Sequence, residues 1–193
     1  YSESCDQNRD AILKIIKPLF KGRKNVLEIG SGTGQHAVYF AQKMPHLIWH
    51  TSDKKENHPG ILAWIEEAAL DNVRAPIALD VSRNEWPTYE IDAIFSANTA
   101  HIMSWPEVET LMAGVGEKLA SNDPFILYGP FNHDGKFTSE SNARFDQWLK
   151  NRDPLSGVRD FEELDKLAKD AGMRLDNDFE MPANNRILCW RKL

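Results

Sequence analysis

Three glycines spaced two apart interrupt the stretch VLEIGSGTGQH, which runs from position 26 to position 36. Glycine permits a positive φ angle and lets a ligand lie directly against the main chain. A glycine turn that opens a helix also presents free backbone N–H groups, which favour an anion. Gly30, Gly32 and Gly34 therefore predict a ligand-binding turn between a strand and a helix.

The spacing of these glycines departs from that of a dinucleotide-binding turn. That fingerprint is G-x-G-x-x-G, and its third glycine would fall at position 35, where this sequence has Gln35. The G-K-[ST] sequence of a P-loop is also missing after the glycines. Phosphate binding is therefore disfavoured, although a nicotinamide-dependent oxidoreductase stays open as a less favoured function.

Three carboxylates lie near the ends of the first three predicted strands: Glu28, Asp53 and Asp80. In an open α/β sheet, ligands bind at the carboxyl ends of the strands. An acid after the second strand can accept hydrogen bonds from both hydroxyls of a ribose. The alternative roles are a strand-end cap for Asp53 and a turn former for Asp80. Together the turn and the acids favour a ligand that carries adenosine.

Strands alternate with helices along the chain, which predicts an α/β fold with a mostly parallel sheet. The last two strands have no helix between them, which predicts an antiparallel hairpin at one edge. The length favours a single domain over residues 1–193. The expected strands are 25–29, 47–51, 76–79, 92–96, 124–128, 174–180 and 186–191, and the expected helices are 9–20, 37–44, 61–69, 107–119, 141–150 and 161–171.

The composition, 41% apolar and 27% charged, is that of an ordinary globular protein. A net charge of −6 argues against a nucleic-acid partner. No apolar run approaches the roughly 18–20 residues of a membrane span. The start YSESCDQNRD does not resemble a signal peptide. Cys5 and Cys189 are expected to be free thiols in a reducing cytoplasm, with a disulfide between the two chain ends as the less favoured alternative. The solvated side of the first helix and the turn after it are expected to carry Lys14, Lys17, Lys21, Arg23 and Lys24.

Several phrases of the sequence resemble a known superfamily. VLEIGSGTG, the acid in HTSD, LDVS, DAIFSANTAHIMSW and the hairpin ending are similar to class I S-adenosylmethionine-dependent methyltransferases. SESCDQNRDAIL, SGTGQHAVYFAQKMPHLIW, ILYGPFNHDGKFTSESNARFDQWL and MPANNRILCW resemble the family that includes methyltransferase-like protein 26. The resemblance covers nearly the whole chain. It implies a Rossmann-like three-layer sandwich with a seven-stranded, mostly parallel sheet, whose last strand inserts antiparallel near one edge.

The resemblance also implies S-adenosyl-L-methionine as the cofactor and a position for each part of it. The residues that would bind it are Glu28, Gly30, Ser31, Gly32 and Gly34 at the methionine end, Asp53 at the ribose, Asp80 and Val81 at the adenine, Asn98 near the methionine moiety, and Asn8 and Arg9 over the carboxylate. The resemblance does not supply a substrate.

Methyl transfer is an in-line displacement, and much of its catalysis comes from positioning the nucleophile and excluding water. A general base is needed when the nucleophile arrives protonated, and His101 is the best candidate because its ordinary pKa suits that task. The alternative is a histidine that orients the cofactor or caps the following turn. Tyr128 either aims its hydroxyl at the substrate or is a core aromatic.

The loop after the fifth strand begins with Phe131, Asn132 and His133, where a substrate loop is expected, and the longer connection that follows is typical of a lid. Three arginines there either grip an acidic substrate or are solvated helix charges: Arg144, Arg152 and Arg159. His46 and His50 lie on a predicted strand without nearby ligands, so no metal site is expected.

The sequence therefore predicts a cytoplasmic S-adenosylmethionine-dependent methyltransferase that acts on a small molecule, with no nucleic-acid or membrane partner. The alternative is a protein that binds S-adenosylmethionine without turnover, as a partner subunit or a sensor. That alternative stays open because the sequence contains no decisive catalytic residue.

Overall fold

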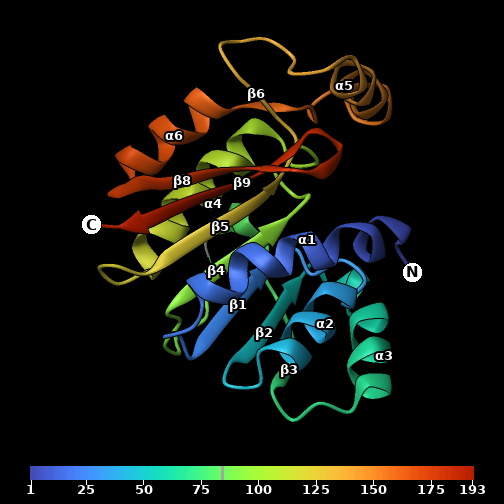
Figure 1. Ribbon diagram of the computed structural model, residues 1–193, viewed down its shortest axis with the longest axis vertical. Helices are drawn as coiled ribbons and strands as arrows, with labels where there is room; N and C mark the ends of the chain where they lie inside the picture. The colour runs from blue at the N-terminus through green and yellow to red at the C-terminus, as the bar shows by residue number, and fades with distance from the viewer. Residues whose placement is uncertain (84) are drawn as a thin grey trace. The chain divides into compact units, whose positions relative to one another are not determined.

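The computed structural model describes residues 1–83 and 85–193. Seven strands form one sheet in the order β3-β2-β1-β4-β5-β9-β8, and β6 pairs with β7 in a separate ladder (Figure 1). The pairs β1–β2, β1–β4 and β2–β3 are parallel, whereas β9 runs antiparallel to both β5 and β8. The predicted α/β Rossmann-like fold is thus confirmed, including the insertion of the last strand next to the edge strand β8.

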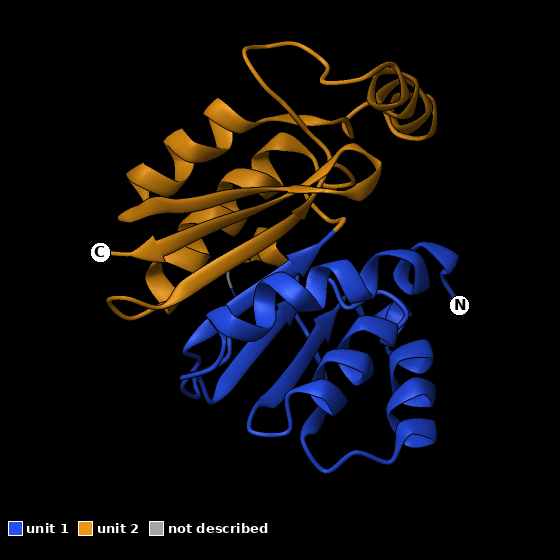
Figure 2. Cartoon of the chain, viewed as in Figure 1, with its two compact units in different colours: residues 1–80, 85–97 blue, residues 81–84, 98–193 orange. Residues whose placement is uncertain are grey.

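The chain divides into two compact units (Figure 2). Unit 1 comprises residues 1–80 and 85–97, and unit 2 comprises residues 81–84 and 98–193. The elements of unit 1 are α1 (Glu3–Leu19), β1 (Asn25–Ile29), α2 (Gln35–Lys43), β2 (Ile48–Asp53), η1 (Lys55–Asn57), α3 (His58–Ala68), β3 (Val73–Ala78) and β4 (Ala93–Ala97). The elements of unit 2 are η2 (Val81–Arg83), α4 (Trp105–Lys118), β5 (Pro124–Gly129), β6 (Phe131–Asn132), α5 (Glu140–Arg152), β7 (Arg159–Asp160), α6 (Phe161–Asp170), β8 (Met173–Met181), η3 (Pro182–Asn184) and β9 (Asn185–Lys192).

The parallel register of unit 1 brings the carboxyl ends of its strands to one edge. Ile29 pairs with Ser96, and Asp53 pairs with Ala78, so these four strand ends lie level. Beneath this edge, the buried rings of Phe40, Trp49 and Phe95 pack with their centroids 5.5–5.8 Å apart. This apolar cluster supports the residues that emerge at the end of β1.

Helix α1 begins at Glu3, six residues before the predicted start at Arg9. The first two turns are polar and carry no apolar periodicity, but Glu3 and Asp6 suit the positive end of a helix dipole. The buried side chains Ile12, Ile16 and Phe20 follow at intervals of four, as expected of a helix that packs on one face.

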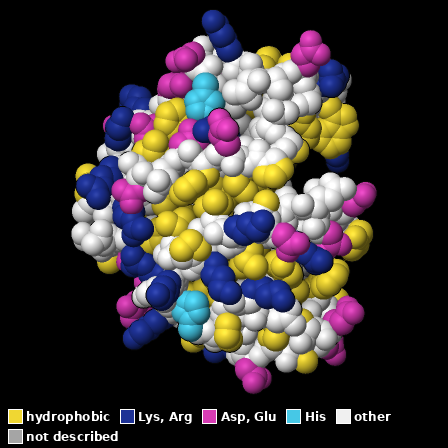
Figure 3. All heavy atoms as spheres, in the orientation of Figure 1, with side chains coloured by type: hydrophobic (Ala, Val, Ile, Leu, Met, Phe, Trp, Pro, Cys, Tyr) yellow, Lys and Arg dark blue, Asp and Glu magenta, His cyan; other side chains and the backbone are white. Residues whose placement is uncertain are grey.

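Basic side chains lie on the solvated side of α1 and the turn after it, as the sequence predicts. Figure 3 shows Lys and Arg side chains gathered over this helix. The exposed members of the predicted group are Lys14, Lys17, Lys21 and Lys24.

In unit 2, α4 begins with a capping box in which Ser104 accepts from the N–H of Glu107 and the Glu107 carboxylate accepts from the N–H of Ser104. Strand β5 does not stop at Tyr128 as predicted, because Gly129 still pairs with Arg186 of β9. The ladder of β6 and β7 was not predicted. A strand of two residues has no periodicity from which it could be recognised.

Candidate functional site

The turn between β1 and α2 has a left-handed backbone at each of its three glycines. The φ angles are +71° at Gly30, +58° at Gly32 and +89° at Gly34. A Cβ atom at Gly34 would also lie 3.1 Å from the Cα atom of Ile61. Ser31 ties the turn to β2, because its N–H donates to the carbonyl of Ser52 and its hydroxyl accepts from the N–H of Ser52. The turn therefore needs glycine and is held in one shape.

Asp53, the last residue of β2, binds this turn directly. Its Oδ2 atom accepts a hydrogen bond of 2.7 Å from the N–H of Gly32. Its Oδ1 atom accepts from the N–H of Lys54 at 2.7 Å and from Nδ2 of Asn57 at 2.8 Å. The sequence analysis placed Asp53 just past the strand with a role at a ribose. Its position within β2 adds a second role, which is to connect the ends of β1 and β2.

Glu28 lies beneath the turn and is only 2% exposed. Its carboxylate accepts from Nε1 of Trp49 at 3.1 Å, and its backbone carbonyl accepts from the hydroxyl of Ser52 at 2.6 Å. Burial raises the pKa of Glu28 to about 7, although hydrogen bonds from Trp49 and Ser31 oppose the rise and the charge of Asp53 adds to it. A cation bound beside this carboxyl would therefore stabilise its ionised form.

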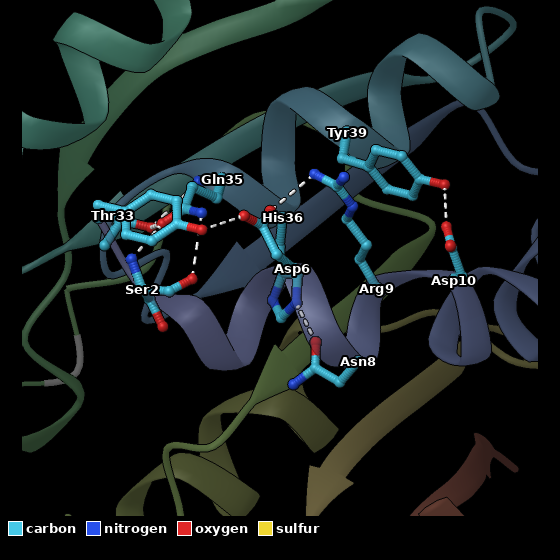
Figure 4. Close-up of polar contacts among 10 residues, drawn as sticks. Ser2, Asp6, Asn8, Arg9, Asp10, Thr33, Gln35, His36 and Tyr39 are labelled. Carbon is cyan, nitrogen blue, oxygen red and sulfur yellow. Dashed lines mark hydrogen bonds and ion pairs between the residues drawn. The ribbon is translucent and has the colours of Figure 1, made fainter.

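Gln35 explains why the turn has no glycine at its sixth position. Figure 4 shows its side-chain amide directed toward Ser2 and Thr33. Its Oε1 atom accepts from the N–H of Ser2 and from the hydroxyl of Thr33, and its Nε2 atom donates to the carbonyl of Ser2 at 3.2 Å. Gln35 thus fastens the start of α1 to the glycine turn, a contact that glycine could not make.

Helix α1 supplies Asn8 and Arg9, which the resemblance places over the cofactor carboxylate. Oδ1 of Asn8 lies 2.7 Å from Nε2 of His36, and the Arg9 guanidinium binds Asp6 at 2.7 Å and lies 4.6 Å from the ring centre of Tyr39 (Figure 4). Both side chains thus have partners within unit 1.

The sequence analysis missed His36, a buried residue in the first turn of α2. Burial lowers the pKa of His36 to about 4, so the ring is neutral near pH 7. Its ring stacks on Phe40 with centroids 5.1 Å apart. The only sequence signal was its place directly after the glycine turn.

The end of β3 carries two further predicted cofactor residues. Asp80 is half-buried two residues beyond β3, and Val81, in η2, is buried. In unit 1, the N–H of Leu79 donates to the carbonyl of Asp53 at 3.3 Å, which keeps the chain after β3 close to the end of β2.

The candidates for catalysis lie in unit 2, in the segment that starts at Asn98, directly after β4. Asn98 has a φ angle of +58°, an uncommon conformation for a residue with a side chain. Its N–H donates to the carbonyl of Tyr128 at 2.9 Å. A Cβ atom at Gly129 would lie 3.8 Å from Nδ1 of His101 and 3.9 Å from Oδ1 of Asn98. The structure thus brings Asn98, His101 and the end of β5 together.

His101 is 7% exposed, and Tyr128 is 3% exposed. Burial and, to a smaller extent, the charge of Arg159 together lower the pKa of His101 to about 4. This pKa differs from the ordinary value of 6.5 on which the sequence argument for a general base relied. His101 is neutral near pH 7 and can accept a proton, but it is a weaker base than an exposed histidine.

Arg159 holds the loop that carries His101. Its guanidinium donates to the carbonyls of Ala100 at 3.2 Å and Leu155 at 2.8 Å, and also to that of Met103. In addition, the N–H of Gly157 donates to the carbonyl of His101 at 2.9 Å. Of the two roles considered for Arg159, a grip on an acidic substrate or a solvated helix charge, neither describes these contacts, which fix the backbone around His101.

The other two arginines lie on α5. Arg144 lies 3.8 Å from the carboxylate of Glu140, and Arg152 lies 4.7 Å from the ring centre of Trp148. These contacts resemble those of solvated helix charges, the second role considered.

Among the described residues, no group of three or more His, Cys, Asp or Glu side chains is arranged to hold a metal ion. Cys5 and Cys189 are both free thiols. None of the helices in residues 1–83 and 85–193 is long and apolar enough to cross a membrane.

Solved structures with the same fold include proteins described as methyltransferases. The S-adenosylmethionine-dependent methyltransferase SibL, in its apo form, superposes with a TM-score of 0.82 at 20% identity, covering 97% of this chain and 55% of that one. An O-methyltransferase family 2 protein from Planctomyces limnophilus, in complex with apigenin, gives a TM-score of 0.78 at 16% identity, covering 88% and 51%. PigF with SAH gives a TM-score of 0.82 at 13% identity, covering 95% and 54%.

This chain therefore spans about half the length of these solved structures. At such identities the likeness establishes the fold. A family model described as "Protein of unknown function (DUF938)" matches residues 1–192. The chain belongs to this DUF938 family.

Proposed function

We propose that this chain is a cytoplasmic methyltransferase that uses S-adenosyl-L-methionine to methylate a small molecule. The observation that carries the proposal is the hydrogen-bonded group of Glu28, the turn Gly30–Gly34 and Asp53 in unit 1. The fold shared with PigF, described with SAH, and with an O-methyltransferase family 2 protein, described with apigenin, supports both the cofactor and the substrate class.

The charges at the turn favour this cofactor over a dinucleotide. Glu28 places a buried acidic group beneath the turn. In its ionised form this group repels a pyrophosphate and attracts the ammonium and sulfonium groups of S-adenosylmethionine. Gln35 supports the same choice, because its amide already binds Ser2 where a dinucleotide turn has glycine.

When bound, the cofactor supplies a methyl carbon made electrophilic by a sulfonium. We assign the methionine end to Glu28, Gly30, Ser31, Gly32, Gly34 and Asn98, the ribose to Asp53, the adenine to Asp80 and Val81, and the carboxylate to Asn8 and Arg9. To bind the cofactor carboxylate, Arg9 would have to give up its ion pair with Asp6. Asn8 would bind the carboxylate while its Oδ1 atom keeps its contact with Nε2 of His36.

His101 is our candidate for the group that takes a proton from the methyl acceptor. Its ring is neutral and can therefore accept a proton. Arg159 and Gly157 bind the backbone around His101 and so hold the residue in place. Tyr128 is the second candidate, because it precedes Gly129 at the end of β5. We also propose that the whole chain works as one domain, and that it is functionally related to the family of methyltransferase-like protein 26.

The test of the cofactor is a thermal melt with S-adenosylmethionine, S-adenosylhomocysteine or NAD. A ligand at about 100 times its dissociation constant adds roughly 2.7 kcal/mol to the free energy of unfolding. For a chain of this size that corresponds to a rise in Tm of about 5–10 °C. A rise with NAD and none with the two sulfur compounds would contradict the proposal.

A second function, binding of S-adenosylmethionine without turnover, is favoured by the low pKa of His101. A weak base gives less help in deprotonating an acceptor. Transfer of a labelled methyl group from S-adenosylmethionine to any molecule in a small-molecule extract would exclude this function. Binding without any transfer would support it.

A further inference from the structure

Asn132, the last residue of β6, carries a buried oxygen without a hydrogen-bond partner. The residue is 8% exposed, and its Oδ1 atom accepts no hydrogen bond from the described residues. Its Nδ2 atom donates to the carbonyl of Val158 at 3.4 Å, which fixes which end of the amide is nitrogen. A buried acceptor left without a donor costs about 1–3 kcal/mol. The oxygen is therefore expected to receive a donor from outside the chain.

The place of Asn132 in unit 2 connects it to the catalytic candidate. The segment 155–159 contacts both residues: Gly157 donates to the carbonyl of His101, and Val158 accepts from Asn132. Asp146 of α5 holds the same segment, because its Oδ1 atom accepts from the N–H of Val158 at 2.9 Å. Asn132 and His101 are thus fixed by neighbouring residues of one segment.

Aromatic rings lead from His101 to the surface along α5. The rings of His101 and Phe145 meet edge to face with centroids 5.1 Å apart, and Phe145 stacks on Trp148 at 5.8 Å. Trp148 is 49% exposed, although large apolar side chains are usually covered. Although Arg152 lies 4.7 Å from the ring centre of Trp148, the exposed part of this ring offers apolar surface to an aromatic ligand.

From these observations we infer that Oδ1 of Asn132 binds an O–H or N–H donor of the methyl acceptor, and that the acceptor is a small aromatic molecule. The inference rests on the proposed function, since it names the substrate class of that site. Asn132 would then determine specificity, because a molecule of the same shape without a donor leaves the buried oxygen unpaired.

The experiment uses matched probe pairs, phenol against anisole and aniline against N,N-dimethylaniline, which differ chiefly in the donor. Binding to the full chain with S-adenosylhomocysteine present is measured by ligand-observed NMR titration. The wild-type chain is expected to prefer each donor about tenfold, the effect of one buried hydrogen bond. Asn132→Leu should abolish the preference, and Asn132→Asp should retain it.

If Asn132 had only a structural role, through its hydrogen bond to Val158, Asn132→Leu should lower Tm. The inference predicts instead that Asn132→Leu leaves Tm unchanged or raises it, because the change removes a buried acceptor without a partner. The matched control is Asn142→Leu: Asn142 is also buried, but its Nδ2 atom donates to Thr138 and Asn184, so this change should lower Tm and keep the donor preference. Equal binding of both members of each pair to the wild-type chain would overturn the inference, even if no variant folds.

A separate titration with S-adenosylhomocysteine alone distinguishes this inference from the proposed function. If S-adenosylhomocysteine binds and the donor preference is absent, a water molecule satisfies Asn132 and only the inference fails. If S-adenosylhomocysteine does not bind, the proposed function fails, whatever the probes show.

Discussion

The carboxylate of Asp53 accepts a hydrogen bond of 2.7 Å from the backbone N–H of Gly32, so the acid at the end of β2 fixes the turn at the end of β1. Its other oxygen already accepts two hydrogen bonds, from Lys54 and Asn57. A carboxylate oxygen has about two acceptor positions. Oδ2 therefore keeps one acceptor position while it holds the turn, and the proposed ribose hydroxyl would use that position.

Replacing this carboxylate should weaken cofactor binding. Asp53→Ala is expected to lower the affinity for S-adenosylhomocysteine by about 1–3 kcal/mol, because it removes charged hydrogen bonds. Calorimetric titration measures the change. Asp170→Ala, an exposed acid on α6 paired with Lys166, is the control and should leave the affinity unchanged. Unchanged affinity in Asp53→Ala would mean that the ribose is bound elsewhere.

A side chain at the end of the glycine turn should destabilise the chain. Gly34→Ala places a Cβ atom on a backbone with a φ angle of +89°, 3.1 Å from Cα of Ile61. The left-handed conformation alone costs roughly 1–2 kcal/mol. Urea unfolding should show at least this loss, and S-adenosylhomocysteine should bind more weakly. Gly22→Ala meets nothing within 4 Å and should change neither quantity.

The sequence predicts those features of the turn that depend on neighbouring residues, and it does not reveal contacts between residues far apart in the chain. Strand β1 was predicted with its observed bounds, because an apolar run between polar residues and glycines is a local signal. The contact of Gln35 with Ser2 joins residues 33 positions apart, and no local pattern reveals it. The sequence therefore identified Gln35 as a departure from the dinucleotide turn without its structural reason.

The same limit applies to unit 2. The position of His101 after β4 was available from the order of the strands, but its low pKa depends on burial by chain segments distant in sequence. Arg159 was considered for a substrate, and only the fold shows that it binds the carbonyls of Ala100, Met103 and Leu155.

Glu28 should make folding stability depend on pH. Burial raises its pKa from 4.5 to about 7, so between these values the folded chain binds the proton more tightly than the unfolded chain does. This contribution is fully present below pH 4.5 and is lost as pH rises to about 7. The change in the pKa of Glu28 on folding corresponds to about 3 kcal/mol in the free energy of unfolding.

The variant Glu28→Gln isolates this contribution, because other groups titrate equally in both proteins. Urea unfolding near pH 5 and near pH 8 should show that Glu28→Gln gains stability relative to the wild-type chain as pH rises. Parallel behaviour of the two proteins would show that Glu28 ionises at its ordinary pKa.

Two histidines should have the opposite effect. Burial lowers the pKa of His36 and of His101 from 6.5 to about 4, so the unfolded chain binds these protons more tightly. Their contribution is present above pH 6.5 and is lost as pH falls toward 4. In an NMR titration, the imidazole signals of His36 and His101 should remain those of neutral rings down to about pH 5. His36→Asn and His101→Asn assign them, and a midpoint near 6.5 for either would contradict its burial.

Calorimetric titration of the wild-type chain shows whether the turn of unit 1 binds S-adenosylmethionine or a dinucleotide. We expect saturable binding of S-adenosylhomocysteine at one site, weakened in Asp53→Ala, and no heat of binding with NAD. Saturable binding of NAD together with no binding of S-adenosylhomocysteine would contradict this expectation.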